Sequence, residues 1–210
     1  FGIGSGAYQR EFDRMKPGLK QSDAWRYMQE MLPVVRELWK GDVEHNGEFW
    51  QFPTSTSVPK PVQPDVPVWV SARSPITYDY AMRNKCHVNC WPLTRPFAEA
   101  ELYKQQLDEA IAKADNGWIP RFALMRHACL YDNDADRSEA LNAIRTLISQ
   151  FENLFRNSGD VVNGFPKSIP LDELEGREQY DPAMLEENLM FGSPDTVIQK
   201  LKRYQALGVN

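Results

Sequence analysis

The stretch PVWVSARSPIT, residues 67–77, contains the transition that decides the fold. Its first half is apolar at neighbouring positions around Val70, which is typical of a parallel strand that is buried on both faces. The stretch then turns polar, and Ser74 or Thr77 could cap a helix that follows. The stretch therefore predicts a buried strand over 66–72 that leads directly into a helix over 76–83.

The same alternation of strands and helices continues on both sides of this stretch. Repeating strand–helix units imply parallel strands, either in a doubly wound sheet or in a (β/α)8 barrel. The hydrophobic periodicity predicts the remaining elements: a strand end over 1–5, a helix from a Ser22 cap to Gly41, a hairpin over 43–52, strands over 87–91 and 121–131, and helices over 97–114 and 134–155. A last helix is capped by Ser193 and ends at Gly208. Its predicted buried face consists of Val197, Ile198, Leu201, Tyr204 and Leu207.

Breaker and turn residues predict several local features. Pro33 lies inside the periodic pattern of the first long helix and predicts a kink or a break. Asn46-Gly47 is the preferred dipeptide of a two-residue hairpin turn, and we expect the His45 side chain to be solvated. The hairpin and the proline-rich stretch after it form an insertion over 43–67. Residues 157–185 have no clean period and are predicted to be an excursion loop with one helical turn.

Length, charge and cysteine content limit the class of protein. The 210 residues allow one large domain or two small ones, and we expect a single domain over 1–210. The 24 Lys and Arg against 29 Asp and Glu give a net charge of −5, which argues against partners such as nucleic acid or an anionic membrane. No apolar stretch approaches the ~20 residues of a membrane span. Three cysteines are too few for a disulfide framework, so we expect a cytoplasmic protein.

The two ends of the sequence predict a segment of a longer protein. The sequence opens on Phe1 without an initiator Met, and Gly208 is followed by Val209 as the first residue of a new strand. A (β/α)8 barrel typically takes ~250 residues. Four strand–helix units and the start of another strand would form the back part of such a barrel.

An anion site is one of two interpretations of the residues that open the helix after the 66–72 strand. Amides at a helix N-terminus bind anions, Ser74 and Thr77 add hydroxyl donors, and Arg73 adds a charged planar fork. A phosphate would suit this arrangement. A plain N-cap at Ser74 or Thr77 is the equally weighted alternative, since it explains two of the three residues.

Two other motifs contain residue types typical of a dinucleotide-binding site and of a metal site, but their context supports neither site. Residues 2–7 satisfy the glycine fingerprint of dinucleotide-binding folds, but 8–21 show no helical period and no acidic residue follows a second strand at the expected distance. The cysteine and histidine residues of two strands offer metal-ligand types but match no closed zinc site, so we predict no metal; they are Cys86, His87, Cys90, His127 and Cys129.

Several segments in order resemble the bacterial-luciferase-like flavin-dependent monooxygenases. Each motif is weak alone, but the ordered set spans nearly the whole chain. The segments are 1–8 with Glu11-Phe12, Leu38-Trp39 with 43–52, 59–64 with 67–72, and 191–197 with 207–209. The resemblance implies a (β/α)8 TIM barrel of the luciferase-like type, an α/β fold. This chain would hold only the C-terminal part, from about strand 4 to the start of strand 8.

The resemblance also implies an activity. Members of the family use reduced FMN, supplied by a separate flavin reductase, and O2 to oxidise a small organic substrate. An aromatic content of 11% suits an apolar substrate. Two alternatives stay open: a deazaflavin-dependent oxidoreductase on the same fold, which transfers hydride, and a non-catalytic subunit of a luciferase-like pair. A homodimer is expected from relatives.

Site residues follow from the same resemblance, position by position. The family's phosphate site falls on Arg73, Ser74 and Thr77, and Arg73 is expected to supply the charge that Ser5 cannot. The catalytic histidine of many members comes from an early strand that this chain lacks. His127 is the candidate on a late strand, and a hydrogen-bonded interior histidine is the alternative that we favour there. The loop beside the cofactor would be Ser5, Gly6, Ala7 and Tyr8, with Trp91 lining the ring pocket.

Overall fold

The structure is a computed structural model that describes residues 1–15, 17–155 and 161–209. The chain forms two compact units, residues 1–68 and 69–210, and each is described separately. The prediction of a single domain over 1–210 stays a prediction. None of the helices in the described ranges combines the length and the apolar sequence that crossing a bilayer requires.

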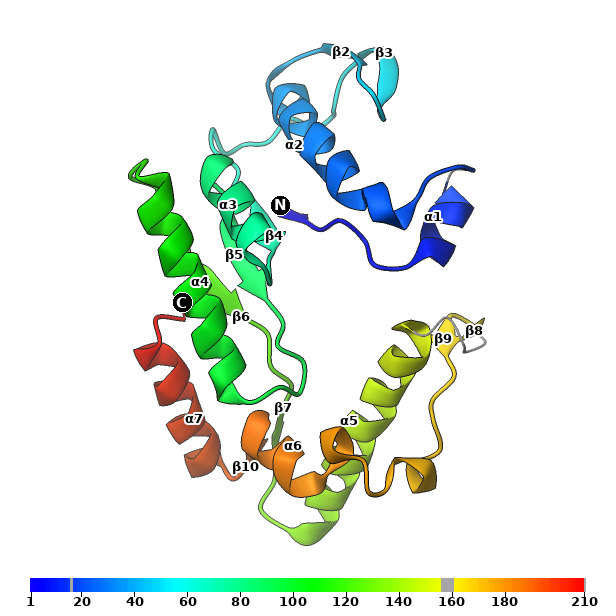
Figure 1. The fold of residues 1–210 in the computed structure, drawn as a ribbon, viewed down its shortest axis with the longest axis vertical. Helices are drawn as coiled ribbons and strands as arrows, with labels where there is room; N and C mark the ends of the chain where they lie inside the picture. Colours follow the sequence, from blue (N-terminus) through cyan, green and yellow to red (C-terminus); the bar gives the residue numbers. More distant parts are fainter. Residues whose placement is uncertain (16, 156–160, 210) are drawn as a thin grey trace. The chain divides into compact units, whose positions relative to one another are not determined.

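The first unit is built around one long helix. Its elements are β1 (Gly2–Ile3), α1 (Gln9–Met15), η1 (Gln21–Asp23), α2 (Ala24–Lys40), β2 (Val43–Asn46) and β3 (Gln51–Ser55) (Figure 1). α1 was not expected, because its seven residues carry a single buried side chain, Phe12, and one apolar position makes no period. Phe12 packs with Ala24 and Tyr27 in the core of this unit.

Two details of α2 differ from the sequence predictions. The helix runs unbroken through Pro33, so a break is wrong, while the kink that was the other predicted outcome stays a prediction. Pro33 is exposed, and solvent can therefore satisfy the carbonyl that a proline leaves without its helical donor. The residue before the helix is Asp23 rather than Ser22, and it makes no side-chain cap. Gly41 ends the helix as predicted.

The hairpin of this unit has a longer turn than the Asn46-Gly47 dipeptide predicts. β2 and β3 pair antiparallel with Asn46 opposite Gln51, so the loop runs from Gly47 to Trp50. The amide of Gly47 donates to the carbonyl of Trp50 at 2.9 Å. The predicted two-residue turn is therefore wrong, because Phe49 and Trp50 turn towards α2 instead of continuing a strand.

The second unit begins with alternating parallel strands and helices. These are β4 (Trp69–Ser71), α3 (Pro75–Arg83), β5 (His87–Cys90), α4 (Phe97–Ala114) and β6 (Phe122–Leu124). β4, β5 and β6 form a parallel sheet in which Val70 lies opposite Val88, and Val88 opposite Phe122. All three side chains are buried. α3 and α4 lie side by side next to these strands (Figure 1). The predicted α/β class, the 97–114 helix and the parallel strands are confirmed.

The predicted strand over 121–131 is divided in two. β6 ends at Leu124, and β7 (Ala128–Leu130) pairs in parallel with β10 (Met190–Gly192), so that Cys129 lies opposite Phe191. Residues 125–127 separate the two halves. The chain thus leaves one strand partner and joins another, and His127 lies at this change of partner.

The 157–185 segment contains more regular structure than a loop with one helical turn. Following α5 (Asp134–Phe155), it includes β8 (Val161–Val162), β9 (Phe165–Pro166), η2 (Leu171–Leu174), η3 (Glu178–Tyr180) and the start of α6 (Pro182–Asn188). Leu174 and Tyr180 are fully buried, which anchors the segment against α5. Residues 157–160 of the predicted excursion lie outside the described residues.

The last helix, α7 (Pro194–Ala206), confirms its predicted ends but not its whole buried face. The hydroxyl of Ser193 accepts a hydrogen bond from the amide of Thr196, and Gly208 follows the helix with φ +91°. Val197 and Tyr204 are buried against α4 and β10. Ile198 and Leu201, predicted to be buried, are 45% and 52% exposed because only one side of the helix is covered.

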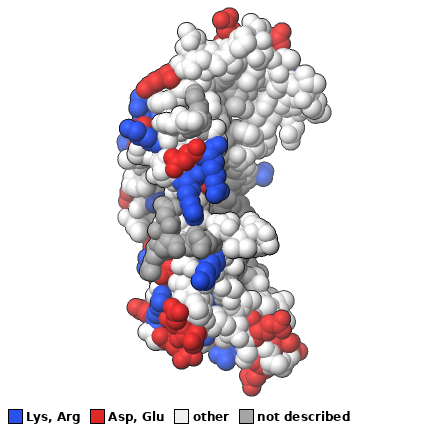
Figure 2. Space-filling view, turned by 90° about the vertical axis from the view of Figure 1, so that its right-hand side faces the viewer, with Lys and Arg blue, Asp and Glu red and all other residues white. Residues whose placement is uncertain are grey.

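Charged side chains of both signs are mixed on the surface. On the face drawn in Figure 2, Lys and Arg side chains lie among Asp and Glu side chains. This mixing agrees with the near balance of the two charge types in the sequence.

Candidate functional site

The carboxyl ends of β4 and β5 meet at one edge of the sheet. The amide of Ala72 donates to the carbonyl of Asn89 at 3.0 Å, and the thiol of Cys90 donates to the carbonyl of Ala72 at 2.7 Å. The residues that follow, Arg73 and Trp91, therefore leave the sheet side by side. Ligands of parallel α/β sheets bind at this edge. The structure thus places Arg73 and Trp91 after neighbouring parallel strands, at the same edge of the sheet.

Ser74 and Thr77 close the start of α3 by bonding to each other. The hydroxyl of Thr77 accepts from the amide of Ser74 at 3.2 Å and donates to its carbonyl at 2.8 Å, and the two hydroxyl oxygens are 3.0 Å apart. The N-cap interpretation of these two residues is confirmed. Anion binding there stays a prediction, and it is compatible with the cap because both side chains are at the surface.

Arg73 has a free charge beside this cap. Among the described residues, its guanidinium makes no hydrogen bond or ion pair. Burial raises the pKa of the neighbouring Cys90 thiol to about 11, while the hydrogen bond with Tyr78 and the charge of Arg73 act in the opposite direction. Arg73 is therefore close enough to the end of β5 to act on Cys90.

Two of the possible metal ligands named from the sequence, Cys86 and His87, make other contacts in the structure. The thiol of Cys86 lies 3.6 Å from the carbonyl of Asn84. Nδ1 of His87 accepts from the amide of Arg121 at 3.0 Å, and the His87 ring lies against the rings of Trp69 and Trp118. Over the described ranges, no three His, Cys, Asp or Glu side chains come together in a way that could hold a metal ion.

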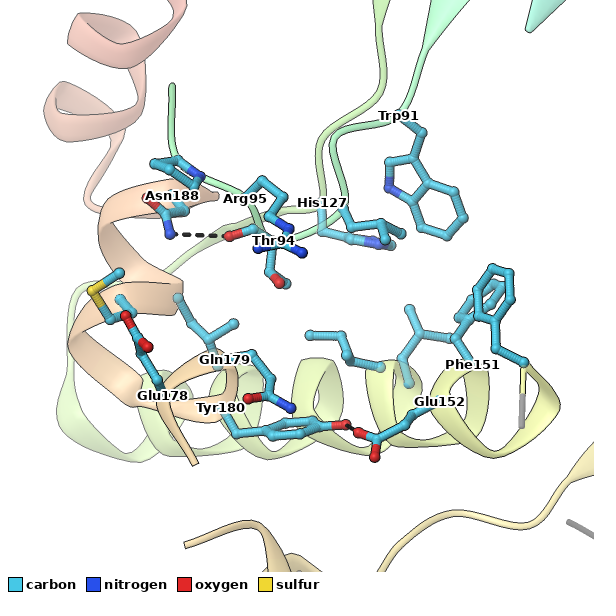
Figure 3. Close-up of a pocket in the computed structure, with 17 residues that line it drawn as sticks. Trp91, Thr94, Arg95, His127, Phe151, Glu152, Glu178, Gln179, Tyr180 and Asn188 are labelled. Carbon is cyan, nitrogen blue, oxygen red and sulfur yellow. Dashed lines mark hydrogen bonds between the residues drawn. The ribbon is translucent and has the colours of Figure 1, made fainter. Parts of the chain in front are cut away.

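A cavity of about 570 Å³ opens beyond Trp91, which lies at the carboxyl end of β5. This volume is in the usual range for sites of small organic ligands. Its lower wall is α5 and η3, and its upper wall is the chain that follows β5 (Figure 3). The apolar and aromatic lining residues are Trp91, Leu93, Pro96, Leu147, Ile148, Phe151, Phe155, Tyr180, Met184 and Leu185.

Trp91 and His127 form one end of the cavity. Their rings meet edge to face with centroids 5.8 Å apart, and Trp91 meets Phe151 in the same way at 5.1 Å. The indole Nε1 of Trp91 is buried and has no hydrogen-bond partner among the described residues. It lies on the edge of the ring that faces His127 (Figure 3). A buried donor without a partner is costly, so this position suits a ligand acceptor.

His127 lines the cavity rather than the closed interior. Among the described residues, its ring makes no hydrogen bond, and the favoured alternative of a hydrogen-bonded interior histidine stays a prediction. Burial lowers the pKa of His127, which keeps the imidazole neutral and able to accept a proton at neutral pH. A catalytic role for His127 stays a prediction.

The loop that follows Trp91 is held from two directions. Nη1 of Arg126 donates to the carbonyl of Leu93 at 2.9 Å and to the carbonyl of Arg95 at 2.8 Å. Nη2 of Arg126 donates to the carbonyl of Pro96 at 3.4 Å. The amide of Asn188, which is 8% exposed, donates to the carbonyl of Thr94 at 3.0 Å. Leu93 has φ +53°, an uncommon conformation for a branched side chain. All four carbonyls from 93 to 96 are therefore bound, and the loop is fixed.

The acidic group in the cavity wall is already compensated. Glu152 accepts a hydrogen bond from the hydroxyl of Tyr180 at 2.5 Å and lies 3.4 Å from the guanidinium of Arg177. Its carboxylate therefore contributes little net negative charge to the cavity.

Sequence reasoning missed most of this wall. Thr94 and Arg95 come three and four residues after the end of the predicted strand over 87–91, so their position near the carboxyl end of a parallel strand was a usable signal. Tyr180 comes from the segment without a period and Asn188 follows shortly after it, and no local signal places either of them in the cavity.

The candidate residues of the first unit lie between β1 and α1. Gly6 has φ +78°, and a Cβ there would lie 3.0 Å from the ring of Phe12, so glycine is required by conformation and by space. Partial burial, and then the charge of Glu11, raise the pKa of Tyr8. Ser5, Gly6, Ala7 and Tyr8 belong to a different unit from Arg73 and Trp91, and the prediction that all of them serve one cofactor stays a prediction.

Comparison with known sequences gives a match over the whole chain. A family model described as luciferase-like monooxygenase matches residues 1–210. The oxygenase component of a flavin-dependent trigonelline monooxygenase from Acinetobacter baylyi is 36% identical over 208 residues, which are 99% of this chain and 58% of that protein. The chain therefore spans little more than half the length of this curated relative.

Comparison with solved structures gives the same fold at low identity. An F420-dependent secondary alcohol dehydrogenase, solved with an F420–acetone adduct, has a TM-score of 0.68 at 16% identity, over 100% of this chain and 61% of that chain. The oxygenating constituent of 3,6-diketocamphane monooxygenase from Pseudomonas putida, a type II Baeyer–Villiger monooxygenase in complex with FMN, has a TM-score of 0.61 at 15% identity. It is matched over 99% of this chain and 61% of that chain.

Proposed function

We propose that this chain, which belongs to the luciferase-like monooxygenase family, is part of an oxygenase that uses reduced FMN and O2 to oxidise a small organic substrate. The flavin-dependent oxygenase component at 36% identity supports this activity. We also propose that the chain forms the C-terminal part of a (β/α)8 barrel, from about strand 4 to the start of strand 8. Its parallel strands support this placement, since a helix follows each of β4, β5, β7 and β10.

The observation that carries the proposal is the cavity beyond Trp91, which lies at the carboxyl end of β5, the strand that pairs with β4. The residues that follow these two strands suit a flavin phosphate and ring. Arg73 offers an unpaired guanidinium beside the start of α3, and Ser74 and Thr77 add hydroxyl groups at the surface. Trp91 offers a large flat ring and a buried N–H that lacks an acceptor.

Reduced flavin supplies the electrons with which O2 is activated, so the chain's own residues need to bind, orient and exclude water. Arg73 would hold the phosphate charge. The aromatic and aliphatic wall from Trp91 to Phe151 keeps water from the reacting groups. His127, neutral and directed into the cavity, would accept a proton on a ring nitrogen.

A separate flavin reductase would supply the reduced cofactor. The relative from Acinetobacter baylyi is named as an oxygenase component, which supports a two-component system. A homodimer in the cytoplasm completes the proposal, and the three cysteines, none of which forms a disulfide, are compatible with a reducing compartment.

The test is titration of reduced and of oxidised FMN into the full-length protein, for the parent, Arg73→Ala and Arg83→Ala. Arg83 lies in the last turn of α3, away from the cap, so Arg83→Ala is a control that removes one positive charge from the same helix. We expect tight binding of reduced FMN that weakens about 10-fold or more in Arg73→Ala, because charge-assisted hydrogen bonds are lost, and that is unchanged in Arg83→Ala. Equal affinity of the parent and Arg73→Ala would overturn the phosphate assignment.

A deazaflavin-dependent oxidoreductase is the second candidate. It is favoured by the likeness of the fold to an F420-dependent alcohol dehydrogenase. The same titration separates the two, since binding of a deazaflavin without binding of FMN would support hydride transfer in place of oxygenation. Binding of neither would favour a non-catalytic subunit.

A further inference from the structure

We propose that the cavity beyond Trp91 takes a small aromatic carboxylate as substrate, with Arg95 binding the carboxylate group. The proposal names the substrate class of the proposed oxygenase and rests on that function. It is carried by four observations: an unpaired guanidinium, a fixed loop, a flat aromatic wall and a buried donor without an acceptor.

Arg95 is the cationic group of the cavity that has no partner. Its guanidinium makes no hydrogen bond or ion pair among the described residues, and the residue is exposed where the cavity meets solvent. The planar fork of arginine matches the two oxygens of a carboxylate. The other arginine near the cavity, Arg177, is already paired with Glu152.

The loop that carries Arg95 is preorganised. Arg126 and Asn188 together bind the four carbonyls from 93 to 96, which leaves the side chains of Thr94 and Arg95 free to extend towards α5 (Figure 3). A fixed loop reduces the entropy lost when a ligand binds. The hydroxyl of Thr94, next to the guanidinium, is a second donor for the same anion.

The remaining walls suit a ring. Trp91 and Phe151 present aromatic surfaces at one end, and Tyr180 adds a third ring from η3. Aromatic pairs of this kind favour another flat ring in an edge-to-face or offset arrangement. The unpaired Nε1–H of Trp91 can meet an acceptor on the ligand.

Negative charge in the cavity does not oppose the carboxylate. Glu152 is compensated by Tyr180 and Arg177. Glu178 is exposed, and it makes no ion pair with Arg95. Solvent screens the charge of the exposed Glu178, so this carboxylate opposes an anionic head group near Arg95 only weakly.

The test compares benzoate with benzamide, which has the same ring and no charge. Both are titrated by calorimetry into the full-length protein, with and without oxidised FMN, for the parent, Arg95→Met, Arg95→Lys and Arg83→Met. We expect benzoate to bind at least about 10-fold more tightly than benzamide, since charged hydrogen bonds are the stronger ones. Arg95→Met should remove that preference, Arg95→Lys should keep part of it, and Arg83→Met should leave it unchanged.

FMN affinity of the same variants separates this proposal from the proposed function. FMN binding without any preference for benzoate, or a preference that persists in Arg95→Met, would overturn the substrate class while the oxygenase proposal stands. A benzoate preference that depends on Arg95 in a protein that binds no flavin would support the site and overturn the oxygenase. Circular dichroism of each variant confirms that a lost signal is not a loss of fold.

Discussion

Glu30 and His45 are joined by a 2.9 Å contact between Oε1 and Nε2, which ties the middle of α2 to the first strand of the hairpin. The same carboxylate accepts hydrogen bonds from the amides of Phe49 and Trp50, both at 3.0 Å. One acidic side chain thus holds the whole hairpin loop. The expectation that the His45 side chain is solvated was wrong, because it is only 23% exposed and lies against Glu30.

The first prediction concerns acid stability. Burial acts to raise the pKa of Glu30, but the hydrogen bonds with His45, Trp50 and Phe49 outweigh it and lower that pKa. Because the pKa is lower in the folded state, Glu30 stabilises the fold above the unfolded-state pKa of about 4.3. This contribution is lost as the pH falls through the folded-state pKa.

Urea denaturation at a series of pH values checks this. Glu30→Gln should cost about 1–3 kcal/mol at pH 7, since one of the two accepting oxygens becomes an NH2 group that cannot accept, and it should flatten the acid part of the pH profile. Glu37→Gln, an exposed carboxylate on the same helix, should cost less than about 1 kcal/mol and keep the profile. If Glu30→Gln and the parent lost the same free energy of unfolding as the pH falls, Glu30 would not be the source of the acid sensitivity.

The second prediction concerns Gly47. A Cβ there would lie 1.9 Å from Oε1 of Glu30 and 2.5 Å from Nε2 of His45, so Gly47→Ala must displace the carboxylate. We expect a loss of about 1–3 kcal/mol, as for other overpacked sites. Gly41→Ala, where a Cβ meets nothing within 4 Å, is the control for the change of residue type. The losses in Gly47→Ala and Glu30→Gln should not add in the double variant, and additivity would show that the two sites are independent.

The third prediction concerns Arg126. Arg126→Met removes the donors that hold the carbonyls of Leu93, Arg95 and Pro96, and we expect a loss of about 2–3 kcal/mol in urea denaturation. Arg126→Lys should recover only part, because lysine lacks the planar fork. Arg121→Met is the control, since Arg121 is exposed. Unchanged stability in Arg126→Met would show that the loop does not depend on this side chain.

The fourth prediction compares two tryptophans of the second unit. Nε1 of Trp118 donates to the carbonyl of Cys86 at 3.3 Å, whereas Nε1 of Trp91 has no partner among the described residues. Both Trp→Phe variants lose packing, but only Trp118→Phe also loses a hydrogen bond. We expect Trp118→Phe to be about 1 kcal/mol more destabilising in thermal or urea unfolding. A larger loss in Trp91→Phe would mean that its indole N–H is paired in the folded protein.

The strand–helix order and the ends of the long helices were readable from the sequence. The helices 97–114 and 134–155 begin and end where their patterns predict, and Ser193 and Gly208 frame the last helix as expected. Local signals suffice here, because helix caps and apolar periodicity act within a few residues. Arg73, Ser74 and Thr77 were likewise placed at a strand end by the sequence around them.

Only the tertiary structure decided what those elements enclose. The pairing of Glu30 with His45, the capture of the 93–96 carbonyls by Arg126 and Asn188, and the position of Tyr180 beneath the cavity all join residues far apart in the chain. The division of the 121–131 strand depends on a change of partner from β5 to β10, which no local pattern contains. Sequence periodicity reports the faces of single elements, whereas a binding cavity depends on which faces meet.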